Sequence, residues 1–216
     1  AHRRDRTRAE STAGTGKTTA LKAALHVLRQ EGFCFRVAAY TGVAASNVGE
    51  GAQTLSTTFR LSRINAASGD IEDLKGKALE ELVNEMKGVR LLVIDEVSMV
   101  SRVVLAQVSK RLQECRVYEG DAARMDLPFG GGSVILAGDF GQLPPVAEPE
   151  EMSLLCPKVL SGGSRMSTAN VGQRLFQDFR TVVRLRRIHR QPGASVYKES
   201  LIRLRDGAMT PSDVKL

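Results

Sequence analysis

Residues 9–25, AESTAGTGKTTALKAAL, have the spacing of a phosphate-binding loop that runs into an α-helix. Gly14 and Gly16 precede Lys17 and Thr18, as in the pattern G-x-x-x-x-G-K-[ST], where backbone N–H groups and the lysine surround phosphate oxygens. The threonine hydroxyl of this pattern binds Mg²⁺, and the start of the helix adds the positive end of its dipole. The residues predicted to contact nucleotide are Ala13, Gly14, Thr15, Gly16, Lys17, Thr18 and Thr19.

The residues before Lys17 depart from this pattern in two ways. Ser11 stands in place of the first glycine, which adds a modest penalty if that position needs a positive φ. Residues 1–10, AHRRDRTRAE, are charged, whereas such a loop normally follows a buried apolar strand. We therefore predict a charged leader in which the first strand is missing. The alternative for the loop itself is an ordinary helix start capped by Thr15.

The composition limits the possible classes of protein. A chain of 216 residues that is 42% hydrophobic can form one sizeable core, or one domain and the beginning of another. The formal net charge of +7 modestly favours a polyanionic partner. Three widely spaced cysteines indicate neither a disulfide framework nor a zinc site. The chain has no run of 18 apolar residues and no signal-peptide core, so we expect no membrane contact and an intracellular, non-secreted protein.

Strands and helices are predicted to alternate along the chain. Apolar runs of strand length occur at 33–40, 89–94, 133–138 and 181–185, and helical patterns at 17–30, about 72–87 and about 98–115. This alternation predicts an α/β fold with a mostly parallel sheet flanked by helices. Segments rich in glycine, proline and serine are predicted to be loops, at 125–132, 142–151 and 161–172.

Two acidic residues follow the apolar run LLVIDE, residues 91–96. An α/β sheet presents ligand-binding groups at the carboxyl ends of its strands, so this position suits a catalytic site. Asp95 is suited to hold Mg²⁺ directly or through water, and Glu96 to orient and deprotonate the attacking water. The alternative is a plain strand end.

A further strand ends in ILAGDFGQLPPV, residues 135–146. An amide such as that of Gln142 can donate to a γ-phosphate and accept from a water, which makes it a candidate sensor of the triphosphate. The alternative is an exposed glutamine in a turn.

Five segments together resemble the Pif-family DNA helicases of superfamily one, including the helicase parts of Helitron transposons. They are TAGTGKT, AAYTGVAASNVGEGAQTLSTTF, LLVIDEVSMVS, PFGGGSVILAGDFGQLPPV and RIHRQ, and they span nearly the whole chain. The family comprises ATP-dependent motors that move 5′ to 3′ on single-stranded DNA, with ATP between two RecA-like domains. The resemblance thus implies a RecA-like P-loop NTPase domain at 1–180, and at 181–216 the junction to a second RecA-like domain that is largely absent.

The resemblance also implies roles for individual residues. Lys17 and Thr18 take the phosphate and Mg²⁺ roles, and Asp95 and Glu96 the Mg²⁺ and general-base roles. Gln142 contacts the γ-phosphate. Arg190, in RIHRQ, matches an arginine that approaches the same phosphate near the domain junction; the alternative is a basic, solvated strand. ATP and Mg²⁺ are the implied cofactors.

The segment from Thr41 to Phe59 resembles the single-strand contact region of the family. Thr41, Gly42 and Thr54 are expected to meet backbone phosphates of single-stranded DNA. Phe59 either stacks on DNA or packs in the core. Ser56 stands where the family usually has histidine.

The resulting prediction is the ATP-binding half of a DNA helicase, which hydrolyses ATP when a second domain and DNA complete it. Unwinding by this chain alone is not expected, because stepping requires two domains that close around ATP. The alternatives are a non-catalytic nucleic-acid-binding fragment and a different P-loop NTPase. In a eukaryote, the resemblance implies a nuclear or mitochondrial protein.

Overall fold

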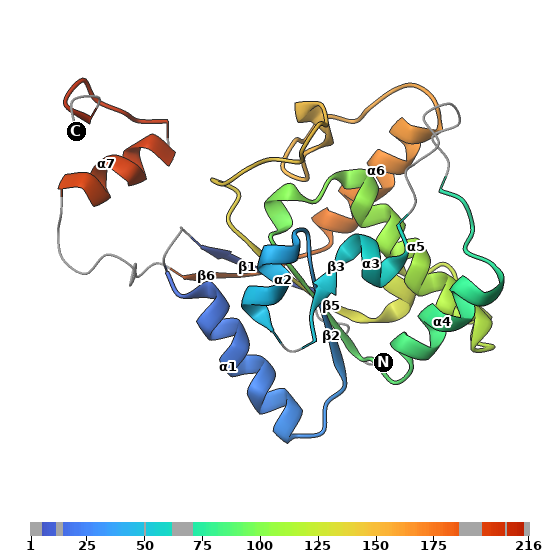
Figure 1. The fold of residues 1–216 in the computed structure, drawn as a ribbon. Helices are drawn as coiled ribbons and strands as arrows, with labels where there is room; N and C mark the ends of the chain where they lie inside the picture. The colour runs from blue at the N-terminus through green and yellow to red at the C-terminus, as the bar shows by residue number, and fades with distance from the viewer. Residues whose placement is uncertain are drawn as a thin grey trace.

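Six parallel strands form one sheet in the order β3-β2-β4-β5-β1-β6 (Figure 1). The computed structural model describes residues 6–11, 15–49, 51–61, 71–185, 196–205 and 207–213. The strands are β1 (Arg6–Ser11), β2 (Phe35–Ala39), β3 (Gln53–Thr54), β4 (Leu91–Asp95), β5 (Ser133–Gly138) and β6 (Thr181–Leu185). The predicted α/β class with a parallel sheet is confirmed, and the four apolar runs all form strands.

Seven helices are described, of which the first six lie between successive strands and the seventh follows β6. They are α1 (Lys17–Gln30), α2 (Gly42–Val48), α3 (Leu55–Phe59), α4 (Gly76–Met86), α5 (Arg102–Tyr118), α6 (Ser164–Gln177) and α7 (Val196–Arg205). Short 3₁₀ turns are η1 (Val97–Met99), η2 (Ala122–Arg124), η3 (Pro128–Gly131) and η4 (Glu150–Met152). The predicted helix 17–30 has the observed bounds, and the two others begin four residues later than predicted. Within the described part of the chain, no helix combines the length and apolar character that crossing a bilayer requires.

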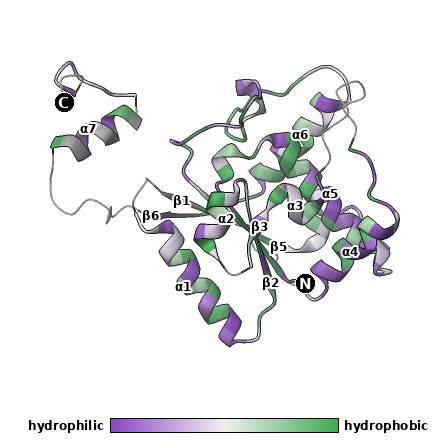
Figure 2. Ribbon diagram, in the orientation of Figure 1, coloured by the Kyte–Doolittle hydropathy of each residue, from purple (hydrophilic) through white to green (hydrophobic). Residues whose placement is uncertain are grey.

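Side chains alternate across β4 and fill a separate core on each face of the sheet. Leu92 and Ile94 pack in the cluster formed with α3, α4, α5 and α6. Leu91 and Val93 pack in a second cluster that contains Leu25 of α1. Because both faces are covered, every residue of β4 is buried, which explains its continuous apolar run. Figure 2 shows polar and apolar residues alternating around α1, as expected for a helix with one face on the sheet.

The prediction that the charged leader lacks a strand is wrong. Residues 6–11 form β1, which pairs with β5 on one side and β6 on the other. Its arginines lie on the face toward α6 and η3, where the Arg8 guanidinium lies 4.8 Å from the ring centroid of Phe176 and Arg6 lies 5.8 Å from that of Phe129. Arginine can occupy this interface because its aliphatic stem packs like an apolar side chain while its planar head stacks on aromatic rings.

The prediction of a loop over 161–172 is also wrong, because α6 begins at Ser164. The buried face of this helix includes two small residues, Ala169 and Gly172, so the sequence carries only a weak apolar period there. A Cβ atom built on Gly172 would lie 1.8 Å from the carbonyl oxygen of Arg102 on α5. The glycine therefore lets the two helices approach more closely than any side chain permits.

Candidate functional site

The candidate residues gather where the parallel strands end. The loop before α1 follows β1, Asp95 ends β4, Gln142 follows β5 and Thr41 follows β2. Because all these strands run in the same direction, their carboxyl ends share one edge of the sheet. The strands β4, β5 and β1 are direct neighbours, so the loop, the acidic pair and the Gln142 turn lie side by side.

Gly16 shapes the entry into α1. It is the N-cap residue, with φ 81° and ψ 22°, a left-handed conformation that favours glycine. Among the described residues no side chain caps this helix, so Thr15, which is buried, does not play the capping role of the alternative interpretation. Lys17 begins the helix and is half-buried. The part of the chain that the structure describes thus supplies no capping side chain for the first N–H groups of α1, as an anion site at a helix N-terminus requires.

Ala13 and Gly14 lie outside the described residues, and so does Arg190. Thr18 is half-buried and Thr19 is exposed, both in the first turn of α1.

Asp95 is a buried carboxylate, only 4% exposed. Burial raises the pKa of this carboxyl group above its ordinary value, and the neighbouring Glu96 carboxylate acts in the same direction. The backbone N–H of Glu96, which donates to Asp95 Oδ1 at 2.9 Å, and the positive charge of Lys17 oppose the shift. The charge of the phosphate-loop lysine thus favours the ionised form of the strand-end acid.

Glu96 has an unusual backbone conformation. Its φ of 56° and ψ of 43° lie in the left-handed region, which costs a residue other than glycine on the order of 1–3 kcal/mol. Its carboxylate accepts a hydrogen bond from the Thr41 hydroxyl, with Oγ1 and Oε2 2.7 Å apart. This contact joins the predicted general base to a predicted DNA-contact residue, and nothing in the sequence spacing indicated it.

The DNA-contact candidates have different environments. The hydroxyls of Thr41 and Thr54 cap α2 and α3, where each accepts a backbone N–H at 3.2 Å. Gly42 opens α2, and no atom lies within 4 Å of the position of an added Cβ. Phe59 is fully buried in the core beside α5. Its assignment as a DNA contact is therefore wrong, because a ring with no exposed face cannot stack on a base.

The turn after β5 is held close to the acidic pair. Asp139 is buried, and its Oδ1 accepts the N–H of Gly141 at 3.0 Å. The exposed Gln142 donates its backbone N–H to the Asp139 carbonyl at 2.9 Å. A Cβ on Gly138 would lie 2.9 Å from the nitrogen of Val97, the residue after Glu96. The close approach at Gly138 sets the distance between this turn and the segment that follows the acids.

Arg102 is a structural residue that sequence reasoning missed. Its guanidinium is buried and donates to the carbonyls of Ser153 at 3.0 Å and Lys158 at 2.9 Å, and also to that of Cys156. Burial lowers the pKa of this group. The helix that follows the acidic pair thus holds the segment between the Gln142 turn and α6. An arginine at the first position of a helix that carries several other charged residues gives no sequence signal for such a role.

The donor set fits a nucleotide with Mg²⁺. Magnesium at phosphate sites takes oxygen ligands and commonly uses one or two protein groups together with substrate phosphates. The Thr18 hydroxyl and the Asp95 carboxylate supply such oxygens, and a nearby cation offsets the cost of burying that carboxylate. When bound, the metal would neutralise charge on the transferred phosphoryl group.

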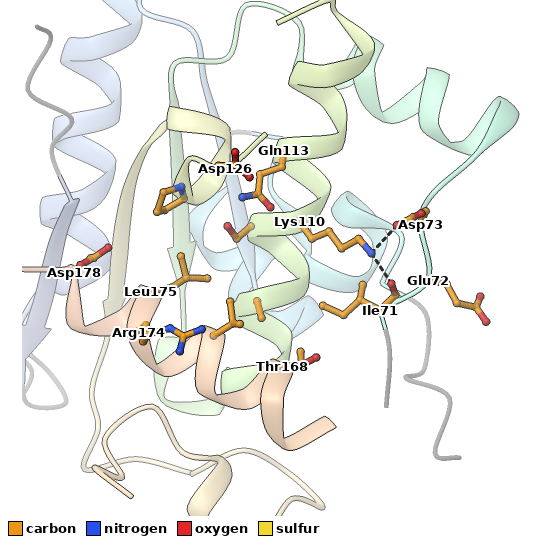
Figure 3. A pocket seen from close by; sticks show the side chains of 14 residues that line it. Ile71, Glu72, Asp73, Lys110, Gln113, Asp126, Thr168, Arg174, Leu175 and Asp178 are labelled. Atoms are coloured by element: carbon orange, nitrogen blue, oxygen red, sulfur yellow. Dashed lines mark hydrogen bonds and ion pairs between the residues drawn. The ribbon is translucent and has the colours of Figure 1, made fainter. Parts of the chain in front are cut away.

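A separate cavity of about 940 Å³ lies between α5, α6 and residues 71–73 (Figure 3). The Lys110 ammonium crosses to one wall, where it contacts the Ile71 carbonyl and Asp73 Oδ1, each at 2.6 Å. This pairing lowers the pKa of the Asp73 carboxyl group. None of the predicted site residues that the structure describes lines the cavity, which is distinct from the strand-end site.

Comparison with known proteins gives concordant matches. The family model described as PIF1-like helicase matches residues 9–214. The ATP-dependent DNA helicase PIF1 of Candida albicans is 29% identical over 206 residues, which cover 91% of this chain and 20% of that protein. The ATP-dependent DNA helicase RRM3 of Saccharomyces cerevisiae is 31% identical over 151 residues, which cover 67% of this chain and 19% of that protein.

Among solved structures, the crystal structure of Bacteroides Pif1 bound to ssDNA superposes with a TM-score of 0.70 at 30% identity. The superposition covers 99% of this chain and 45% of the Bacteroides Pif1 chain. The chain therefore spans about a fifth of these two curated relatives and less than half of the solved one.

Proposed function

Because the chain belongs to the PIF1-like helicase family, we propose that it is the ATP-binding half of a DNA helicase that couples ATP hydrolysis to movement on single-stranded DNA. Hydrolysis and movement require a second RecA-like domain, because stepping depends on two domains that open and close around the nucleotide. On this proposal residues 181–216 lead toward that domain, although β6 still belongs to the sheet of the first.

Each candidate residue has one task in this proposal. Lys17 offsets charge on the β- and γ-phosphates, and Thr18 and Asp95 hold Mg²⁺. Glu96 orients the attacking water and accepts its proton. Gln142 contacts the γ-phosphate. Arg190 supplies positive charge to the same phosphate from the domain junction.

The observation that carries the proposal is the convergence of three strand ends. The loop after β1, the acidic pair after β4 and the turn after β5 come from adjacent strands, and the positive charge of Lys17 opposes the pKa rise of Asp95. A buried carboxylate at a strand end next to a phosphate loop with its lysine is the arrangement that triphosphate chemistry requires.

Single-stranded DNA is the proposed polymer partner. Thr41, Gly42 and Thr54 are available to its backbone phosphates, since each lies at the start of a helix at the strand-end edge. The net charge of +7 supports binding to a polyanion. A nuclear or mitochondrial location, if the source is a eukaryote, also remains a proposal.

Calorimetric titration with a non-hydrolysable ATP analogue and Mg²⁺ tests the nucleotide site. We expect binding by the unaltered chain and at least a tenfold loss in Lys17→Ala, since hydrogen bonds to charged groups contribute about 1.5–3 kcal/mol each. Lys22→Ala removes the same charge from an exposed position of α1 and should bind normally. No binding by a folded sample, or equal loss in the two variants, would refute the assignment.

The non-catalytic alternative predicts a different result. A missing first strand would favour this alternative, whereas residues 6–11 form a strand in the sheet. A folded chain that binds single-stranded DNA but no nucleotide would favour this alternative over the motor.

A further inference from the structure

The Thr41 hydroxyl makes two hydrogen bonds of opposite sense. Its oxygen accepts the backbone N–H of Ala44 at 3.2 Å, and its proton is donated to Glu96 Oε2 at 2.7 Å. Thr41 follows β2 and Glu96 follows β4, and these two strands are neighbours in the sheet. The contact therefore spans from the proposed DNA edge to the proposed catalytic acid.

A hydroxyl group has one proton to donate. The unesterified oxygens of a DNA phosphate are acceptors, as is an ionised carboxylate, so both compete for that proton. The bond from Ala44 leaves the donor capacity of Thr41 unchanged, because it uses a lone pair. Thr41 can thus donate its proton either to Glu96 or to a phosphate, but not to both at once.

From this exclusivity we infer that Thr41 is a positioning residue that holds the Glu96 carboxylate until a phosphate of single-stranded DNA takes its proton. The inference rests on the proposed function, in which Glu96 accepts a proton from water and Thr41 meets DNA. Without DNA, one carboxylate oxygen of Glu96 is hydrogen-bonded to Thr41 and does not accept from the attacking water. DNA binding releases that oxygen, which makes hydrolysis dependent on DNA.

Thr54 provides an internal comparison. Its hydroxyl also caps a helix, but its second partner is the Thr57 hydroxyl at 2.9 Å rather than an acid. It lies at the end of β3, which is separated from β4 by β2. Loss of the Thr54 hydroxyl should therefore weaken DNA binding without altering the response to replacement of Glu96.

The test is a double-mutant cycle on DNA affinity, measured by fluorescence anisotropy with labelled oligo(dT) and the full chain. Glu96→Ala frees the Thr41 proton and also removes a negative charge near DNA. Thr41→Val removes the hydroxyl at nearly constant shape, so the same Glu96→Ala change in that background reports the charge effect alone. We expect the affinity gain from Glu96→Ala to be about tenfold larger with Thr41 present, the size of one charge-assisted hydrogen bond.

Three controls separate this role from a structural one. Thr41→Ser keeps the hydroxyl and should restore the coupling, whereas a purely structural contribution of the methyl group would not be restored. Thr54→Val combined with Glu96→Ala should show no coupling. Thermal unfolding of each variant identifies any that fail to fold. If the valine variant is unfolded, the serine variant still allows the coupling to be measured.

The possible outcomes distinguish this inference from the proposed function. Equal affinity gains with and without the Thr41 hydroxyl would overturn the inference while leaving DNA and nucleotide binding intact. No binding of oligo(dT) by the folded, unaltered chain would overturn both the DNA contact and the inference. Failure of the nucleotide titration alone would refute the motor and leave the affinity cycle as a measure of the contact.

Discussion

Replacing Gly172 with alanine should destabilise the protein, although alanine is the better helix former. The added Cβ would lie 1.8 Å from the carbonyl oxygen of Arg102 and 2.5 Å from its carbonyl carbon, whereas ordinary contacts begin near 3.4 Å. Both atoms belong to backbone, so no side-chain rotation relieves the clash. The helices α5 and α6 must therefore separate by roughly 1.5 Å at the point where they cross.

The net effect combines two opposing contributions. Overpacking of this kind costs about 1–3 kcal/mol and sometimes more, and the exchange of glycine for alanine within a helix returns about 1 kcal/mol. With an overpacking cost at the upper end of its range, we expect the free energy of unfolding to fall by about 2 kcal/mol. For a domain of this size the melting temperature should then fall by about 4–8 °C.

Chemical and thermal denaturation measure this change, with Ser167→Ala as the matched control. Ser167 is an exposed residue of the same helix, and its replacement should alter stability by less than about 0.5 kcal/mol. Amide hydrogen exchange should also increase over residues 153–158, because Arg102 can no longer reach their carbonyls. A Gly172→Ala variant as stable as the unaltered protein would refute the close helix crossing.

Two further predictions concern the turn after β5 and a surface ion pair. Gly138→Ala should weaken binding of an ATP analogue several-fold in calorimetry. The added Cβ would lie 2.9 Å from the Val97 nitrogen and would displace the segment that follows Asp95 and Glu96. Unchanged affinity would contradict this prediction. Hydrogen bonds and charge from Arg60, and from Arg36, lower the pKa of Glu85 below its ordinary 4.5. This pairing stabilises the fold above pH 4.5, and its contribution to the free energy of unfolding disappears as the pH falls through the lowered pKa of the folded state. In urea titrations, the free energy of unfolding of Glu85→Gln should therefore fall less steeply in acid than that of the unaltered chain.

Local signals in the sequence were sufficient for much of the fold. Gly16 and the residues after it define the start of α1, because glycine readily adopts the left-handed conformation from which this helix begins. The run 91–96 predicted both a buried strand and its terminal acids, since a strand covered on both faces must be apolar throughout. These features depend on residues close together in the chain.

The errors arose where burial depends on distant partners. Arg6 and Arg8 pack in a central strand against Phe129 and Phe176, which come from η3 and α6, and Arg6 also pairs with Asp178 at 2.6 Å. Likewise Gly172 of α6 lies against the backbone of Arg102 on α5, a contact that composition alone cannot reveal. The charged leader and the glycine-rich segment therefore have the local composition of irregular structure, although both form regular elements.

The strand order explains why one threonine, and not the other, can connect DNA to the nucleotide site. Chain order would separate Thr41 from Glu96 by 55 residues, but β2 and β4 are adjacent, so their ends meet. Thr54 belongs to the outermost strand on that side and has its partner within its own helix. If DNA reaches the edge through both hydroxyls, only the proton of Thr41 is shared with the acid that activates water, and coupling should be lost with that single hydroxyl even when DNA remains bound.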